Sequence, residues 1–132
     1  MIRRRSRTIR SKDRRGIMNQ NCLFCKIAAG QIGGPPLFQD EHVTAFRDIN
    51  PQAPVHVLLI PNKHISSLSE ASAEDQALLG HLLLTAAKLA QAEGVANGGY
   101  RLVTNTGPDG GQSVFHLHLH LLAGRRLTWP PG

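Results

Sequence analysis

The chain has 132 residues, of which 41% are hydrophobic and 18% charged. This length suits one domain with a hydrophobic core and is too short for two ordinary domains. No stretch approaches the roughly 20 apolar residues of a membrane helix, and the charged N-terminus is not followed by the apolar segment of a signal peptide. We therefore expect a soluble globular protein that does not engage membranes.

The net charge of +6 is concentrated at one end of the chain. Residues 1–17 carry +7 and residues 18–132 carry −1. A basic block without apolar periodicity is usually disordered, so we expect residues 1–20 to form a disordered extension and residues 21–132 to form the domain. The extension could be a nucleic-acid arm, an organelle-targeting segment or upstream sequence from a wrongly chosen start. The domain itself lacks the basic footprint of a nucleic-acid-binding protein.

The first half of the domain predicts one short helix and three strands. Residues 21–30 read as a helix that Asn21 caps and Gly30 ends. After a turn at residues 33–36, strands are expected at residues 37–39, 43–48 and 55–60, and Pro61 ends the last of them.

The second half begins with the long helix, at residues 72–93. Ser72 with Asp75 three residues later predicts its start, and Gly94 predicts its end. Its expected buried stripe is Leu78, Leu79, Leu82, Leu83, Ala86, Leu89 and Ala90. A fourth strand is expected at residues 100–105. This order of elements predicts an α+β fold with the helices on one face of a five-stranded sheet.

Residues 115–121 alternate strictly between apolar residues and histidine, which predicts a half-buried fifth strand. The core face would hold Phe115, Leu117, Leu119 and Leu121, and the opposite face would hold His116, His118 and His120. Such a row could be a solvated strand face, a metal site or a set in which one histidine is a nucleophile. The preceding residues 110–113 form a glycine-bearing turn whose free N–H groups and hydroxyl could surround an anion, which favours the nucleophile.

The run of residues 116–122, His-Leu-His-Leu-His-Leu-Leu, resembles the signature of the histidine-triad (HIT) superfamily. The preceding Gly-Gly-Gln-Ser-Val and the terminal Trp-Pro-Pro-Gly resemble its histidine-triad nucleotide-binding branch in particular. The resemblance runs from about Asn21 to Gly132. It implies a HIT-like fold, a mostly antiparallel five-stranded sheet with one long and one short helix, that pairs as a homodimer.

The resemblance also implies an activity, hydrolysis at the α-phosphorus of a purine nucleotide. His118 would form a covalent nucleotidyl-imidazole, and its other ring nitrogen would donate to a fixed acceptor such as a backbone carbonyl. The matching catalytic residues are His118, His120, Ser113 and His56. On their own, His56 could be an ordinary half-buried histidine and Ser113 a turn hydroxyl.

The family positions that bind the nucleotide map onto a second set of residues. Asp48 would accept hydrogen bonds from both ribose hydroxyls. The phosphate and leaving-group side of the pocket would be lined by Asn105, Gly111, Gln112 and Val114. The slot for the base would be formed by Phe24, Ile27, Phe46, Ile49 and Leu58, although such residues are more often plain core.

The two cysteines, spaced as Cys22-x-x-Cys25, make no disulfide framework and indicate a reducing, cytoplasmic location. This spacing can present two thiolates to one ion, and the resemblance to some bacterial members supplies His64 and His116 as the other ligands. The expectation is a closed, structural zinc site with no organic cofactor. Two free thiols are the alternative.

The favoured substrates are phosphoramidates of purine nucleotides such as AMP and GMP. Hydrolysis of dinucleoside polyphosphates is a second possibility, although the terminal Trp-Pro-Pro-Gly argues against it. A nucleotide-binding interaction protein with incidental catalysis is the third.

Overall fold

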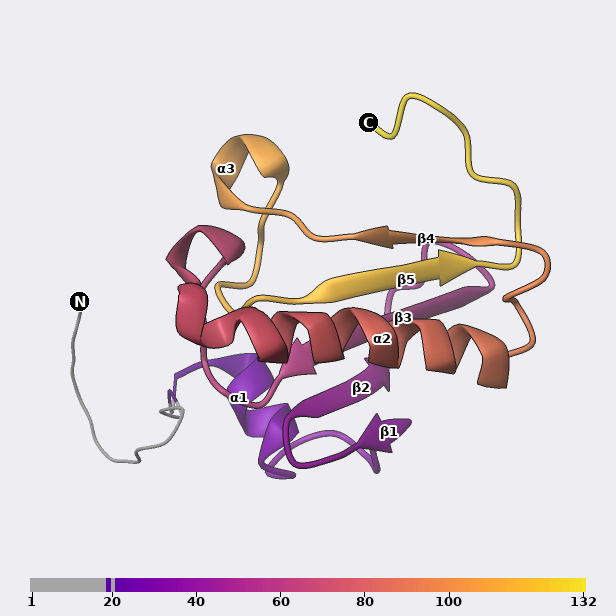
Figure 1. Cartoon of the computed structure of the whole chain (residues 1–132). Helices are drawn as coiled ribbons and strands as arrows, with labels where there is room; N and C mark the ends of the chain where they lie inside the picture. The colour runs from indigo at the N-terminus through magenta and orange to yellow at the C-terminus, as the bar shows by residue number, and fades with distance from the viewer. Residues whose placement is uncertain (1–18, 20) are drawn as a thin grey trace.

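The computed structural model describes residue 19 and residues 21–132 (Figure 1). The extension expected at residues 1–20 lies almost wholly outside the described residues. Within the described residues, no helix is long and apolar enough to cross a membrane.

The domain is built on one antiparallel sheet of five strands. In chain order they are β1 (Phe38–Gln39), β2 (Val43–Arg47), β3 (Val55–Pro61), β4 (Tyr100–Val103) and β5 (Leu119–Ala123). Their order across the sheet is β1-β2-β3-β5-β4, and every pairing is antiparallel. The α+β class and the five-stranded sheet predicted from the sequence are confirmed.

The long helix α2 (Gln76–Ala92) covers one face of this sheet (Figure 1). It follows two 3-10 turns, η1 (Leu68–Glu70) and η2 (Ala73–Asp75), and the predicted capping box between Ser72 and Asp75 is present. Leu82, Ala86 and Leu89 of α2 pack with Val57 and the other sheet residues of the main core. Leu83 is 51% exposed, so its place in the predicted buried stripe was wrong.

The short helix α1 (Leu23–Ala28) packs on the opposite face, which corrects the expectation that both helices share one face. Successive residues of β3 point to opposite faces, so Leu58 and Ile60 contact Phe24 of α1 while their neighbours face α2. The helix is capped by Cys22 rather than by Asn21, because the Cys22 sulfur accepts the backbone N–H of Cys25. This second face carries the candidate site.

The histidine segment differs from the continuous strand that its alternation predicts. Strand β5 begins only at Leu119, and Phe115 is 63% exposed. Upstream, the Leu117 N–H donates to the Ile65 carbonyl at 2.6 Å, so the backbone there is held by a loop rather than by the sheet ladder. A short helix, α3 (Gly107–Gly110), precedes this segment and was not expected.

Candidate active site and metal centre

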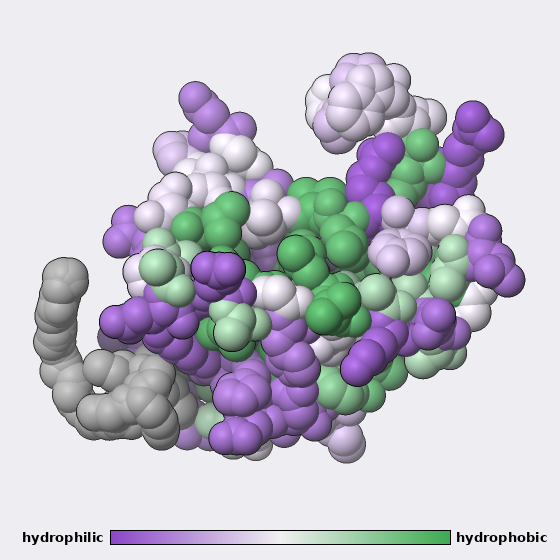
Figure 2. All heavy atoms as spheres, viewed as in Figure 1, coloured by the Kyte–Doolittle hydropathy of each residue, from purple (hydrophilic) through white to green (hydrophobic). Residues whose placement is uncertain are grey.

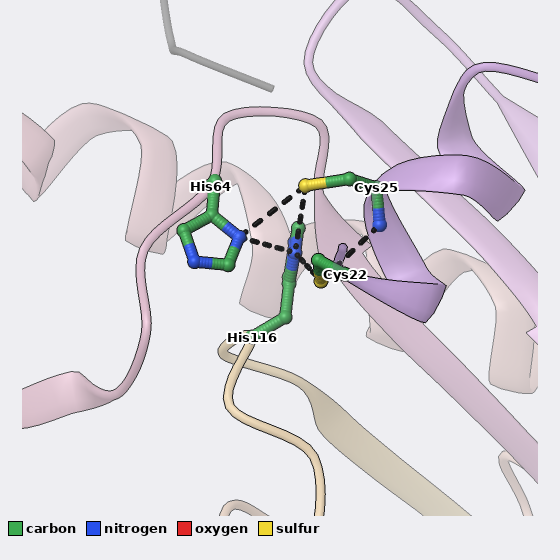
Figure 3. Close-up of side chains that lie close together, drawn as sticks. All are labelled: Cys22, Cys25, His64 and His116. Carbon is green, nitrogen blue, oxygen red and sulfur yellow. Dashed lines mark hydrogen bonds between the residues drawn. The ribbon is translucent and has the colours of Figure 1, made fainter. Parts of the chain in front are cut away.

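Four side chains from three parts of the chain converge beside the N-terminal end of α1 (Figure 3). Cys22 and Cys25 come from the start of α1, His64 from the loop after β3, and His116 from the segment before β5. Their ligand atoms all lie within 4.8 Å of one another. The Nδ1 atom of His64 is 3.3 Å from the Cys25 sulfur and 3.2 Å from the His116 Nδ1. The sequence-predicted Cys₂His₂ set is therefore assembled as a group that could hold a metal ion.

The tautomer of His116 is determined by the hydrogen bond that its Nε2 makes. Its Nε2 lies 2.8 Å from the Pro61 carbonyl oxygen, which can only accept, so the proton resides on Nε2. Nδ1 then presents a lone pair to the Cys22 and Cys25 sulfurs at 3.4 and 3.5 Å. A carbonyl behind the imidazole is the usual outer contact of a metal-ligating histidine.

The two thiols differ in acidity. The pKa of Cys22 is held far below its ordinary value, first by a hydrogen bond from the Cys25 thiol and then by the imidazoles of His116 and His64, against the effect of burial. The pKa of Cys25 is raised by the same bond and by burial. Cys22 therefore presents a thiolate, the form of cysteine that ligates metals.

His118 lies on the same face, two residues further along. Its Nδ1 is 2.7 Å from the His116 carbonyl oxygen, so Nδ1 donates and Nε2 keeps its lone pair. Burial lowers the pKa of His118 and outweighs the opposing effect of this hydrogen bond, so the imidazole is favoured in its neutral form. Phe24 packs edge-on against the ring, with centroids 5.1 Å apart. The fixed backbone acceptor expected for this histidine is present.

His56 and His120 form a directed hydrogen-bond chain. The backbone N–H of Gln52 donates to Nδ1 of His56 at 3.0 Å, so the proton of His56 resides on Nε2. That Nε2–H lies 2.9 Å from Nδ1 of His120 and 3.4 Å from a carboxylate oxygen of Asp48. Accepting at Nδ1 leaves His120 with its own proton on Nε2. Burial lowers the pKa of His120 to about 4, with help from the charges of His118 and His56.

Asp48, His56 and His120 also bring three ligand atoms together, but their hydrogen bonds disfavour a metal. To bind an ion through Nε2, His56 would need its proton on Nδ1, where the Gln52 N–H already donates. Two donors would then face each other. Of the two clusters among the described residues, the Cys₂His₂ group is the one suited to a metal.

In the glycine turn at residues 110–113, some of the backbone N–H groups donate hydrogen bonds within the protein. The backbone N–H groups of Gly111 and Gln112 donate to the carbonyls of Pro108 and Gly107. These two groups are therefore not free to bind an anion, although the sequence predicted that they would be. The Gln112 side chain is buried and bonds Gly107, Ser66 and Val114. Within the described part of the chain, the N–H groups of Ser113 and Val114 have no protein acceptor, so they can still face a phosphate.

Four of the expected base-slot residues lie together on this face of the sheet, namely Phe24, Ile27, Phe46 and Leu58. The fifth expected residue, Ile49, is fully exposed two residues after β2. Asp48 is half-buried beside His56, and its second carboxylate oxygen accepts the Asn50 N–H at 2.8 Å. Asn105 is half-buried two residues after β4.

Sequence reasoning missed the groups that hold the histidines in place. The Pro61 carbonyl orients His116, the Gln52 N–H orients His56, and the Thr104 hydroxyl donates to the His118 carbonyl at 2.8 Å. Two of the three are backbone groups, which every residue carries, so no residue type marks them.

The chain is similar in sequence and in structure to known proteins. The model of the HIT domain family matches residues 30–127. A HIT-like protein of Synechococcus elongatus is 55% identical over 115 residues, which are 87% of this chain and all of that protein. The crystal structure of a HIT family hydrolase from Legionella pneumophila superposes with a TM-score of 0.83 at 56% identity, covering 85% of this chain and all of that one. A histidine triad nucleotide-binding protein from Candida albicans gives 0.71 at 30% identity, covering 83% of each chain.

Proposed function

The chain belongs to the HIT domain family, and from this membership and its site we propose that it hydrolyses purine nucleoside phosphoramidates through a nucleotidyl-His118 intermediate. The similar Legionella pneumophila protein is a HIT family hydrolase, and the similar Candida albicans protein is a histidine triad nucleotide-binding protein. We place this chain in the nucleotide-binding branch because of its Gly-Gly-Gln-Ser-Val and Trp-Pro-Pro-Gly segments.

The observation that carries the proposal is the 2.7 Å hydrogen bond from His118 Nδ1 to the His116 carbonyl. Because this bond holds the proton on Nδ1, Nε2 has a lone pair for attack on the α-phosphorus, and the lowered pKa of His118 keeps that lone pair free at neutral pH. The bond from phosphorus to Nε2 forms as the phosphorus–nitrogen bond to the leaving amine breaks. The amine departs with a proton, which the hydroxyl of Ser113 would deliver.

In the second step, water attacks the phosphorus and returns a proton to Ser113, the bond to His118 breaks so that Nε2 regains its lone pair, and the nucleoside monophosphate leaves. His120 assists both steps, because its Nε2–H is a donor for the charged phosphoryl oxygens. The hydrogen bond from His56 maintains that tautomer. Asp48 would hold the ribose hydroxyls, and Asn105 with the N–H groups of Ser113 and Val114 would complete the contacts of the phosphate.

The metal that we propose for the Cys₂His₂ group is zinc. A tetrahedral zinc site with bonds of about 2.3 Å to sulfur and about 2.0 Å to nitrogen has ligand separations of about 3.3 Å between nitrogens and about 3.5 Å between sulfur and nitrogen. The corresponding separations here are 3.2 Å and 3.3–3.5 Å. When bound, zinc would supply a structural cross-link, since four protein ligands leave no position for water. The two cysteines are free thiols, in keeping with the reducing, cytoplasmic location that we propose.

We further propose that the protein is a homodimer. Leu83 and Leu84 of α2 are 51% and 66% exposed, and hydrophobic side chains gather over the middle of this helix (Figure 2). The neighbouring β4 is an edge strand of the sheet, and Trp129 near the C-terminus is 81% exposed. A second copy could cover these apolar groups and pair with the strand edge.

The deciding experiment offers the purified protein a panel of adenosine phosphoramidates, acyl adenylates and diadenosine polyphosphates. We expect the phosphoramidates to turn over fastest, and a preference for the polyphosphates would instead favour the alternative hydrolase.

His118→Ala should abolish turnover while AMP binding stays within about tenfold, because only the nucleophile is lost. His42→Ala, on the exposed β1–β2 turn, is the matched control and should retain activity. A fully active His118→Ala protein would refute the mechanism.

A further inference from the structure

Cys22 and Cys25 are close enough to react with each other as well as with a metal. Their sulfurs lie within 4.8 Å, and the Cys25 N–H donates to the Cys22 sulfur at 3.4 Å. Residues three apart at the start of a helix have Cα atoms about 5 Å apart, within the range that a disulfide spans. Figure 3 shows both sulfur atoms on the same side of α1, facing the two imidazoles. A disulfide could therefore close without unwinding the helix.

The two sulfur atoms differ in how accessible they are to a small molecule. Cys25 lines a cavity of about 630 Å³, together with Ala28 and Ala29 at the C-terminal end of α1 and Asn62 and Lys63 of the loop after β3. This volume is ample for a hydroperoxide, although the side chain itself is only 1% exposed at the molecular surface. Cys22 is the helix cap, and its sulfur lies 3.4 Å from the His116 imidazole. A metal binds cysteine only as the thiolate, so in the zinc-loaded protein both sulfurs would be thiolates, whatever their acidity without the metal. Cys25, which faces the cavity, is then placed to react first and Cys22 to react second.

We propose that Cys22 and Cys25 are a reversible oxidation site for hydrogen peroxide, and that closure of their disulfide releases the metal. The Cys25 thiolate attacks one peroxide oxygen, the O–O bond breaks, and hydroxide leaves, so that a sulfenic acid remains on Cys25. The Cys22 thiolate then attacks that sulfur, the S–O bond breaks, and a second hydroxide leaves. The two thiolates supply the two electrons that reduce the peroxide, and solvent protons convert both hydroxides to water.

Metal release follows because the disulfide removes two of the four ligands, leaving only His64 and His116. This part of the inference rests on the zinc site proposed above. Loss of the metal would affect the catalytic face through Phe24, which lies between the two cysteines in sequence. Its ring contacts His118 at 5.1 Å and Phe46 at 5.4 Å between centroids. Without the metal, α1 loses its cross-link to the histidine segment, so oxidation should lower thermal stability and weaken nucleotide binding.

The experiment treats reduced, zinc-loaded full-length protein with hydrogen peroxide and follows zinc release, free thiols and intact mass together. We expect both thiols to disappear, the chain to become lighter by two hydrogen atoms, and zinc to appear in solution in parallel. A dithiol reductant with added zinc should restore the starting mass, thiols and melting temperature. None of these measurements uses hydrolysis, so an error in the proposed reaction would not affect them.

Two variants test the order of events. Cys22→Ser should accumulate a sulfenic acid on Cys25 that a dimedone-type reagent traps, and Cys25→Ser should not be labelled on the same timescale. Because both variants lose a metal ligand, peptide mapping of the wild type provides the independent measurement of a Cys22–Cys25 bond. Thiols that survive peroxide, or oxidation that only adds oxygen, would overturn the inference. Protein that never contains zinc but still forms the disulfide would refute the metal site and leave the oxidation site intact.

Discussion

Acidification should reveal His120 as a histidine that resists protonation in the folded protein. Its pKa is lowered from 6.5 to about 4, first by burial and then by the charges of His118 and His56. Proton NMR of the histidine ring resonances should therefore show His120 titrating near pH 4. A group that titrates there stays neutral through the whole physiological range and keeps its Nε2–H for the phosphate that we propose it binds.

The same lowered pKa predicts a pH dependence of stability. As the pH falls below 6.5, the unfolded chain takes up a proton on His120 while the folded chain does not, so the free energy of unfolding declines down to about pH 4. Above pH 6.5 both states are neutral and this contribution is constant. At about 1.4 kcal/mol per pKa unit, the total loss is at most about 3 kcal/mol.

Urea denaturation between pH 7.5 and 4, compared for the wild type and His120→Gln, measures this term. The variant should lose less stability over this range, by up to about 3 kcal/mol. Loss of metal in acid affects both proteins equally and cancels in the difference, because both keep the Cys₂His₂ group. His42→Gln serves as the matched control and should follow the wild type. Equal slopes for the wild type and His120→Gln would refute the reasoning.

Three further perturbations test other parts of the molecule. Asp48→Ala should weaken AMP binding by roughly 1.5–3 kcal/mol, because a charged acceptor of the ribose hydroxyls is lost, and unchanged calorimetric affinity would remove Asp48 from that role. Removal of zinc by a chelator should lower the melting temperature of the wild type but hardly that of His64→Ala, which lacks one ligand. A zinc content below about a tenth of an equivalent in protein purified without chelator would exclude the Cys₂His₂ zinc site. Leu84→Arg should shift sedimentation toward the monomer by placing a charge on the exposed face of α2; a wild type that is already monomeric at micromolar concentration would end the dimer proposal.

Several features of this protein follow from the sequence alone, because they depend on local patterns. The α+β class, the five strands and the capping box at Ser72 were predicted from periodicity and from turn and capping residues, and the structure confirms them. Gly30 and Gly94, expected to end the two helices, both have positive φ, which glycine adopts without strain. The Cys₂His₂ set was taken from family resemblance, and its four residues do converge.

Other features were decided only by tertiary structure. No pattern within α1 indicates which face of the sheet it covers, and packing placed it over the histidines, opposite α2. Alternation predicted one continuous strand, but the contact of Leu117 with the Ile65 carbonyl draws the first histidines out of the ladder. The protonation of His116, His118 and His56 is set by backbone groups of Pro61, His116 and Gln52. Such groups are common to all residues, so their effect depends on where the fold brings them and leaves no mark in the sequence.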